Sequence, residues 1–337
     1  MYTEQDLDAA VAAGVLSADA AASFRRFVAG TRAAPAVDEE HFRLISGFND
    51  IFVSIAILLL LLSLSSLGET LGGGFGHAAA AAVSWGLAEY FTRRRRMALP
   101  SIVLLLSFVG GVFTSAMTIA AAAPAIAGAT AGSVAIGAGC AALAAYLHWQ
   151  RFRVPITIAA GAAALAATIL AGLFVADPNF ETWLNPALLA AGLLVFLLAM
   201  RWDMSDRERL TRRSDVAFWL HLVAAPLIIH PLFTMLGLVG RAGVGVDRAA
   251  LAVAIYLVLA LVALVIDRRA VLVSALAYVL YATSALFRAA GSLTQSFALT
   301  ALCIGTALLL LSALWQPTRR LVVSQLSTRL RTRLPAA

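Results

Sequence analysis

Two histidines and two prolines lie within an otherwise apolar segment of the chain, residues 218–233. His221 and His230 flank Pro226, and Pro231 follows directly. A proline inside a helix removes a backbone hydrogen bond and frees a carbonyl group, which membrane proteins tolerate where it faces protein or a wet cavity. Ionisable groups at membrane depth are costly and usually functional. The segment therefore predicts a kinked span with a candidate cavity or proton site at His221, Pro226 and His230.

A plainer interpretation of the same segment stays open. Each neutral imidazole could simply bond a neighbouring helix, as buried polar groups do. Nine residues correspond to about 900° of helical rotation, so in an unbroken helix the two rings face opposite sides. They share a cavity only if the prolines re-aim the helix. The same geometry argues against His221 and His230 binding one haem or metal ion together.

His77 and Glu89 are two further polar residues in an apolar segment, 74–92. By depth, Glu89 is expected level with His221, and His77 roughly level with His230. A carboxylate beside an imidazole is a plain proton site, so His77 and Glu89 join the candidates. The alternative for Glu89 is an ion pair with Arg93, four residues along the same helix face.

The sequence contains no pattern typical of an enzyme active site. Walker, Gly-x-Ser-x-Gly and His-Glu-x-x-His motifs are absent. Cys140 and Cys303 have no second cysteine or histidine at ligand spacing, which favours a role as small apolar filler over a disulfide or a zinc site. No catalytic residue, metal or cofactor is predicted.

The elements that carry these residues must be membrane helices. Of the 337 residues, 61% are hydrophobic and 13% are charged, whereas a soluble domain is about one quarter charged. Residues 51–67 and 154–176 contain no charge at all. Apolar runs of this length without period-two alternation predict α-helices that cross a bilayer, because lipid satisfies no backbone group. The fold class is therefore an all-α polytopic transmembrane bundle.

Ten spans are predicted. They lie near 51–67, 74–92, 98–119, 125–147, 154–176, 184–200, 216–239, 249–266, 270–287 and 293–314. With both termini in the cytoplasm, all 25 basic residues, every one an arginine, fall in inner segments except Arg241, Arg248 and Arg288. This is the positive-inside pattern, so it supports both the count and the orientation.

Polar segments flank the bundle. Residues 1–37 predict a cytosolic helical hairpin with a linker, residues 38–316 the ten spans, and residues 317–337 a basic amphipathic tail. In the tail, Val322, Leu326, Leu330 and Leu334 recur at four-residue steps among arginines, which favours a helix lying on anionic headgroups. A disordered, solvated tail is the alternative.

The segment Ala12-Ala-Gly-Val-Leu-Ser-Ala-Asp-Ala-Ala21 resembles the amino-terminal hairpin of a family of uncharacterised bacterial polytopic membrane proteins. The segment Asp38-Glu-Glu-His-Phe-Arg-Leu-Ile-Ser-Gly-Phe-Asn-Asp-Ile-Phe52 looks like the approach to that family's first span. The resemblance implies a short cytosolic domain ahead of many spans. That family carries no established activity, so no functional residue is transferred.

The leading functional hypothesis is a transporter-like protein of the bacterial inner membrane, with proton linkage as a candidate mechanism and no assigned substrate. It rests on the proline-containing span with its histidines, and on ten spans that divide into two fives. The rival is a non-catalytic membrane assembly or accessory protein, which the scarcity of polar residues in the spans favours. Expected partners are the bilayer and its anionic headgroups, then a homo-oligomer or another membrane protein, and no nucleic acid.

Overall fold

The computed structural model describes residues 4–31, 48–123, 130–206, 209, 211–237, 246–269, 271–272, 275–276, 278–280, 283 and 296–327. In these ranges every regular element is a helix, so the all-α class is confirmed for them. The chain divides into two compact units, Met1–Phe42 and Arg43–Ala337.

The first unit contains two short helices joined by a turn. Helix α1 (Glu4–Ala12) is followed by a turn in which Gly14 has φ +71°. Helix α2 (Ala18–Thr31) begins after Ser17, whose Oγ accepts a hydrogen bond from the Ala20 amide at 3.1 Å. Leu7 and Ala21 are the buried residues of the pair. A glycine in the left-handed region and a serine cap are the local signals that end one helix and start the next.

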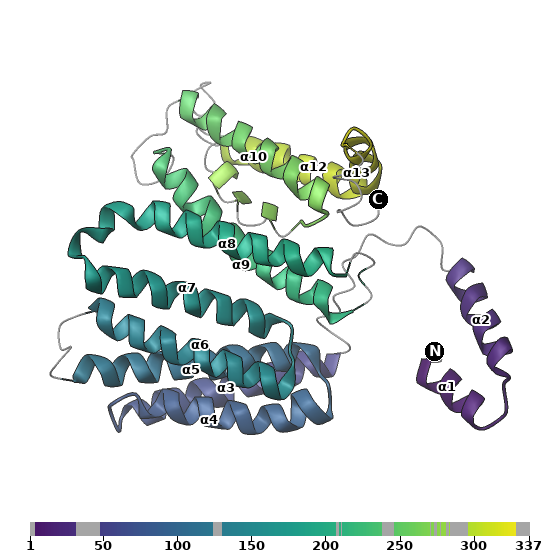
Figure 1. Cartoon of the computed structure of the whole chain (residues 1–337), viewed down its shortest axis with the longest axis horizontal. Helices are drawn as coiled ribbons and strands as arrows, with labels where there is room; N and C mark the ends of the chain where they lie inside the picture. Colours follow the sequence, from purple (N-terminus) through teal and green to yellow (C-terminus); the bar gives the residue numbers. More distant parts are fainter. Residues whose placement is uncertain are drawn as a thin grey trace. The chain divides into compact units, whose positions relative to one another are not determined.

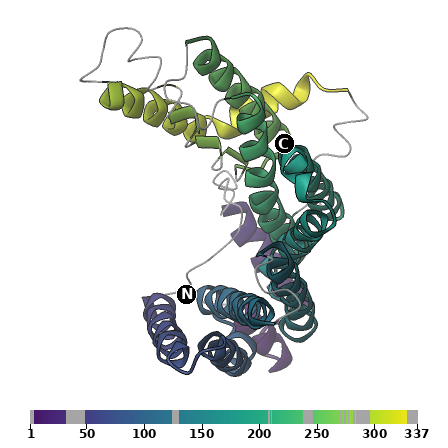
Figure 2. The ribbon, with the colours of Figure 1, turned by 90° about the vertical axis from the view of Figure 1, so that its left-hand side faces the viewer.

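The second unit is built of long apolar helices. They are α3 (Phe48–Glu69), α4 (Phe75–Ala88) with its π-helical extension η1 (Glu89–Arg94), α5 (Ala98–Ala122), α6 (Thr130–Phe152), α7 (Ile156–Ala176), the 3-10 helix η2 (Pro178–Trp183), α8 (Leu184–Met204), α9 (Arg212–Met235), α10 (Val246–Ile266), α12 (Ser296–Ala313) and α13 (Trp315–Ser324). Helices α5, α6, α7, α9 and α8 lie side by side in a row in that order, and α3 and α4 pack against α5 and against each other (Figures 1 and 2). Helix α13 packs against α10.

Seven of the described helices are long and apolar enough to cross a membrane: α3, α5, α6, α7, α8 with η2, α9 and α10. An eighth is reached if α12 and α13, which meet at a 72° bend, form one broken span. Helix α4 is only 14 residues long, against the ~20 that a bilayer requires, but η1 continues it directly. The chain is thus a multi-pass membrane protein, while ten spans and cytoplasmic termini stay predictions.

Glycines set the distance between neighbouring helices in the row. A Cβ atom at Gly137 in α6 would lie 2.8 Å from the Phe113 carbonyl oxygen of α5. A Cβ atom at Gly192 in α8 would lie 2.8 Å from a side-chain carbon of Ile228 in α9. Apolar side chains gain little by leaving lipid for a protein contact, so close backbone approach at small residues drives such packing. The outward faces carry exposed leucines, as a lipid-facing surface does.

The start of the tail differs from the prediction. Helix α13 begins at Trp315, and its buried side is formed by Trp315, Arg319 and Val323. The predicted apolar stripe contains Val322 and Leu326, which are only half-buried, while Leu330 and Leu334 lie outside the described residues. A different side of the helix packs because Trp315 and Arg319 both contact the Asp267 carboxylate. The four-residue repeat of apolar residues does not reveal this contact.

Candidate functional site

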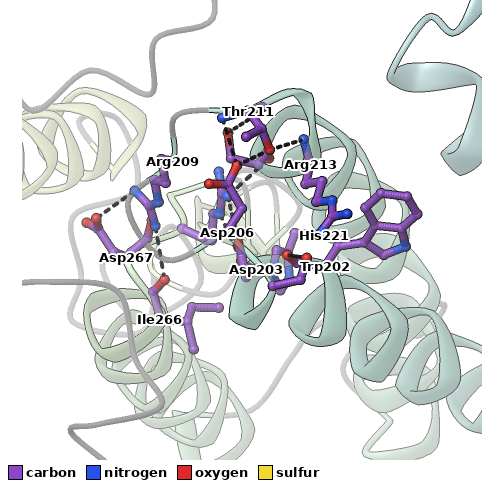
Figure 3. Close-up of polar contacts among 12 residues, drawn as sticks. Trp202, Asp203, Asp206, Arg209, Thr211, Arg213, His221, Ile266 and Asp267 are labelled. Atoms are coloured by element: carbon purple, nitrogen blue, oxygen red, sulfur yellow. Dashed lines mark hydrogen bonds and ion pairs between the residues drawn. The ribbon is translucent and has the colours of Figure 1, made fainter.

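The functional candidate is a cluster of buried charged residues at one end of the bundle, where α8 ends, α9 begins and the chain leaves α10 (Figure 3). We call Asp203, His221 and Arg268 the triad. Asp203 lies in the last turn of α8, His221 lies in α9 and Arg268 follows the end of α10. Their exposed fractions are 3%, 0% and 1%, so the three ionisable groups are shielded from water together.

The Asp203 carboxylate is the centre of the triad. His221 Nε2 lies 3.0 Å from Oδ2, and Arg268 Nε donates to the same oxygen at 3.1 Å. Arg268 Nη2 donates to Oδ1 and also to the Ser214 carbonyl oxygen, the latter at 3.1 Å. A carboxylate only accepts, so His221 Nε2 is the ring nitrogen that carries the hydrogen in this arrangement. One carboxylate thus ties α8 to α9 and to the turn after α10.

The other side of the His221 ring faces apolar surroundings. Its Nδ1 has no hydrogen-bond partner among the described residues. The Phe196 ring of α8 meets the imidazole edge to face, with ring centres 5.2 Å apart. A buried imidazole with one bonded nitrogen and one free nitrogen can take up a proton only if a partner or water reaches Nδ1.

A second carboxylate, Asp267, lies next to Arg268 in the chain and holds a different set of groups. Arg209 Nη1 donates to Oδ2 at 2.7 Å, and Trp315 Nε1 donates to Oδ1 at 2.7 Å. Arg319 Nε lies 3.6 Å from Oδ1 as an ion pair. Asp267 adopts φ +57°, a left-handed conformation that Asp tolerates better than most residues. This turn therefore aims two adjacent side chains in different directions: Arg268 toward the triad and Asp267 toward α13.

The start of α9 is fixed by its own cap. Thr211 Oγ1 accepts a hydrogen bond from the Arg213 amide at 3.2 Å, and it donates to Asp206 Oδ2 at 2.6 Å. The Thr211 amide donates to the same carboxylate oxygen at 2.9 Å. A capped helix start holds Ser214, whose carbonyl oxygen accepts from Arg268, in place.

Arg269, the next residue along the chain after Arg268, packs on the Trp315 ring. Its guanidinium carbon lies 4.7 Å from the centre of the Trp315 ring, and partial burial lowers the pKa of Arg269 from its ordinary value. Beside it is an apolar pocket of about 180 Å³. The lining residues are Tyr256, Arg269, Leu272, Leu276, Leu308, Leu311, Ser312 and Trp315. Neither histidine of α9 lines this pocket.

The predicted site residues are not brought together. Helix α9 runs as one helix from Arg212 to Met235, with Pro226 and Pro231 inside it. His221 is fully buried, whereas His230 is exposed and its Nδ1 lies 2.7 Å from the Tyr278 hydroxyl. The two rings face different sides, as the rotation of an unbroken helix requires. The prolines therefore do not gather His221 and His230 around one cavity.

Glu89 and His77 also have partners of their own. Arg151 of α6 donates two hydrogen bonds to the Glu89 carboxylate, at 2.6 and 3.0 Å, and Arg93 lies 3.3 Å from it. His77 Nε2 lies 3.5 Å from Glu69 Oε1 at the end of α3. The expected pairing of Glu89 with His221 is not what the structure shows, because Glu89 lies in η1, which packs on α4 and α5. The alternative pairing with Arg93 is present.

Sequence reasoning singled out His221 but missed the other two members of the triad. Asp203 lies 18 residues away in α8, and Arg268 lies 47 residues away in the turn after α10. A signal was present in the charge pattern: acidic residues interrupt the arginine-rich segments predicted to be internal, at Asp203 and Asp206 and again at Asp267. Carboxylates beside a membrane, where positive charge is expected, indicate paired groups.

Groups of three or more His, Cys, Asp or Glu side chains placed to hold a metal ion are not found in the described part of the chain. Comparison with protein-family models, with curated proteins and with solved structures finds no match.

Proposed function

We propose that this multi-pass membrane protein is a proton-linked transporter of the bacterial inner membrane, in which Asp203 accepts the proton. The observation that supports it is the triad: a carboxylate, an imidazole and a guanidinium buried together among membrane helices. Substrate identity is not assigned. We also propose, from the amino-terminal resemblance, that the chain belongs to the family of uncharacterised bacterial polytopic membrane proteins.

The cost of burying the triad is the first support. Removing ions from water costs several kcal/mol each, and a well-packed apolar set of similar volume is often as stable or more stable. If this point of the bundle had to do no more than hold helices together, apolar side chains such as leucine and alanine, which are common in α8 and α9, would do so without burying charge. Ionisable groups kept within membrane helices are typical of proton and ion pathways.

The second support is what a proton on Asp203 changes. Ionised Asp203 accepts three hydrogen bonds, two from Arg268 and one from His221. A neutral carboxylic acid gains a donor hydrogen and loses the charge that holds the guanidinium. The bond from Arg268 to the Ser214 carbonyl oxygen of α9 does not depend on the charge of Asp203. Protonation of Asp203 thereby weakens the link between α8 and the turn after α10.

The third support is the path from Arg268 to α13. Asp267 precedes Arg268 and bonds Trp315, so a displaced Arg268 also moves the acceptor that fixes the start of α13. Helix α13 meets α12 at a 72° bend, a geometry that can change by rotation about one junction. The triad and α13 are therefore one mechanically connected group.

The rival function, a non-transporting membrane assembly or accessory protein, is favoured by a different observation. Helix α9 passes both prolines without a break, and both of its imidazoles have partners. In this accessory protein the triad would be a permanent ion-pair contact between helices, and partner helices would bind the exposed apolar faces.

Distance measurements between spin labels separate the two functions. Labels at Ser205 and Gln325, both exposed, report the α8 end against the α13 end in a chain whose two cysteines are replaced by alanine. We expect the distance distribution to shift as pH falls, and Asp203→Asn to show the low-pH distribution at every pH. If the distance distribution changes neither with pH nor with this substitution, the triad is a permanent ion-pair contact between helices. That result would favour the accessory role over transport.

Transport itself is tested in proteoliposomes that contain a pH-sensitive dye. Small-molecule mixtures are added outside, and we expect at least one to drive proton movement in the wild type but not in Asp203→Asn. Glu89→Gln is the matched control, since it removes a carboxylate with two arginine partners at a half-buried position that solvent reaches. Equal proton movement in all three would remove Asp203 from the pathway.

A further inference from the structure

A pocket with two arginines lies at the surface beside the triad, and no role has been given to it. Arg201, Trp202, Ser205 and Arg213 line it, and its volume is about 240 Å³. Arg201 and Trp202 come from the last turn of α8, and Arg213 from the first turn of α9. Figure 3 shows Trp202 and Arg213 on this outer side, away from Asp267.

The pocket has the chemistry of a phosphate site. Two guanidinium groups supply charged donors in planar pairs, the geometry that matches phosphate oxygens. The Ser205 hydroxyl is a further polar group on the wall. Arg213 lies at the start of a 24-residue helix, where the helix dipole also favours an anion. Among the described residues, no carboxylate is seen paired with Arg201 or Arg213.

The surface leading to the pocket is apolar in a way that favours a lipid over a free phosphate. Leu194, Leu197 and Leu198 of α8 are exposed, and they lie seven, four and three residues before Arg201. Residues at these spacings share one face of a helix. An acyl chain lying along the leucines thus brings its headgroup to Arg201, and Trp202 is of the residue type that membrane proteins place at the interface.

We infer that this pocket, which we call the arginine pocket, binds the phosphodiester headgroup of an anionic phospholipid whose acyl chains lie on the leucine face of α8. The proposal is independent of transport, because it uses none of the triad side chains. It does place a lipid one residue from Asp203 and one residue from Ser214. A bound headgroup would therefore stiffen the two helix ends that the triad joins.

Native mass spectrometry of the detergent-purified full chain tests the inference. Phosphatidylglycerol is titrated against phosphatidylcholine, and we expect tighter binding of the first phosphatidylglycerol molecule to the wild type. The variant Arg201→Gln/Arg213→Gln should bind it about tenfold more weakly than the control Arg94→Gln/Arg96→Gln, since hydrogen-bonded charge pairs exceed the general attraction of a basic surface. Both control positions are exposed arginines, so each double variant loses the same charge.

Three outcomes would overturn the inference. Equal loss in the two double variants would show general surface attraction, and unchanged binding in Arg201→Gln/Arg213→Gln would place the lipid elsewhere. Displacement of phosphatidylglycerol by millimolar inorganic phosphate or glycerol phosphate would show a site for free anions. The single variant Arg201→Gln, which should lose part of the affinity, covers the case in which the double variant is poorly folded.

Discussion

Asp203→Asn is the substitution whose effect follows most directly from the geometry. Asn has nearly the shape of Asp, but one carboxylate oxygen becomes an NH2 group. If that group replaces Oδ2, it faces two donors, Arg268 Nε and His221 Nε2. If it replaces Oδ1, it faces Arg268 Nη2. Either orientation sets donor against donor and leaves the buried Arg268 charge without its counter-ion.

The expected loss is large for a single substitution. Removing one partner of a buried ion pair costs ~3–5 kcal/mol, chiefly because the remaining charge stays buried. Replacing both charges, as in Asp203→Leu/Arg268→Met, should restore most of that stability, since a packed apolar pair needs no counter-ion. The free energy of unfolding is measured by titration with a denaturing detergent in mixed micelles.

Glu89→Gln is the control for this series. Glu89 also has two arginine partners, but solvent reaches all three side chains, so the loss should be much smaller. If Asp203→Asn destabilises the protein no more than Glu89→Gln does, the triad is not shielded from water as described. If the apolar pair is as unstable as Asp203→Asn, the cost does not arise from an unpaired Arg268.

Other predictions concern packing, organisation and topology. Gly192→Ala should destabilise the α8–α9 contact by ~1–3 kcal/mol through overpacking, whereas Gly172→Ala, with no atom within 4 Å of its added Cβ, should be neutral or slightly stabilising in the same detergent titration. Deletion of residues 1–35 should leave membrane insertion intact in a fractionation assay, because the hairpin is a separate unit; loss of insertion would show that the bundle needs it. Reporter fusions should read the predicted inside after Arg96, Arg213 and Arg269, and the outside after Thr70, Asp177 and Gly243. Two or more reversed reporters would refute the ten-span orientation.

The helices were predictable from the sequence because they follow from local composition. A charge-free run such as 154–176 has one stable form in lipid, and the helix α7 covers nearly the same residues. The opposite facing of His221 and His230 was predictable for the same reason, since it depends only on rotation along one helix. The hairpin was predictable from Gly14 and Ser17, whose backbone and side-chain roles are local.

The partners of His221 were not predictable in this way. Asp203 reaches His221 because α8 and α9 are antiparallel neighbours, and Arg268 reaches Asp203 because the turn after α10 adopts a left-handed conformation at Asp267. Depth alone suggested Glu89, yet residues at equal depth meet only if their helices adjoin. The order of helices in a bundle depends on how well their surfaces pack, as at the close approach of α8 to α9 at Gly192. The hydrophobic periodicity of the sequence does not show which helices pack together.

The central claim is that Asp203 binds and releases a proton inside the bundle, and infrared difference spectroscopy of the membrane-reconstituted protein tests it most directly. We expect acidification to produce protonated-carboxyl bands that contain a component present in the wild type and in Glu89→Gln but missing from Asp203→Asn, since the other carboxyl groups contribute equally to all three spectra. We also expect an accompanying change in the arginine bands that Arg268→Met removes. Carboxyl bands that are unchanged in Asp203→Asn, or no component from Asp203 across the range in which the protein stays folded, would contradict the claim and leave the triad as a fixed ion pair.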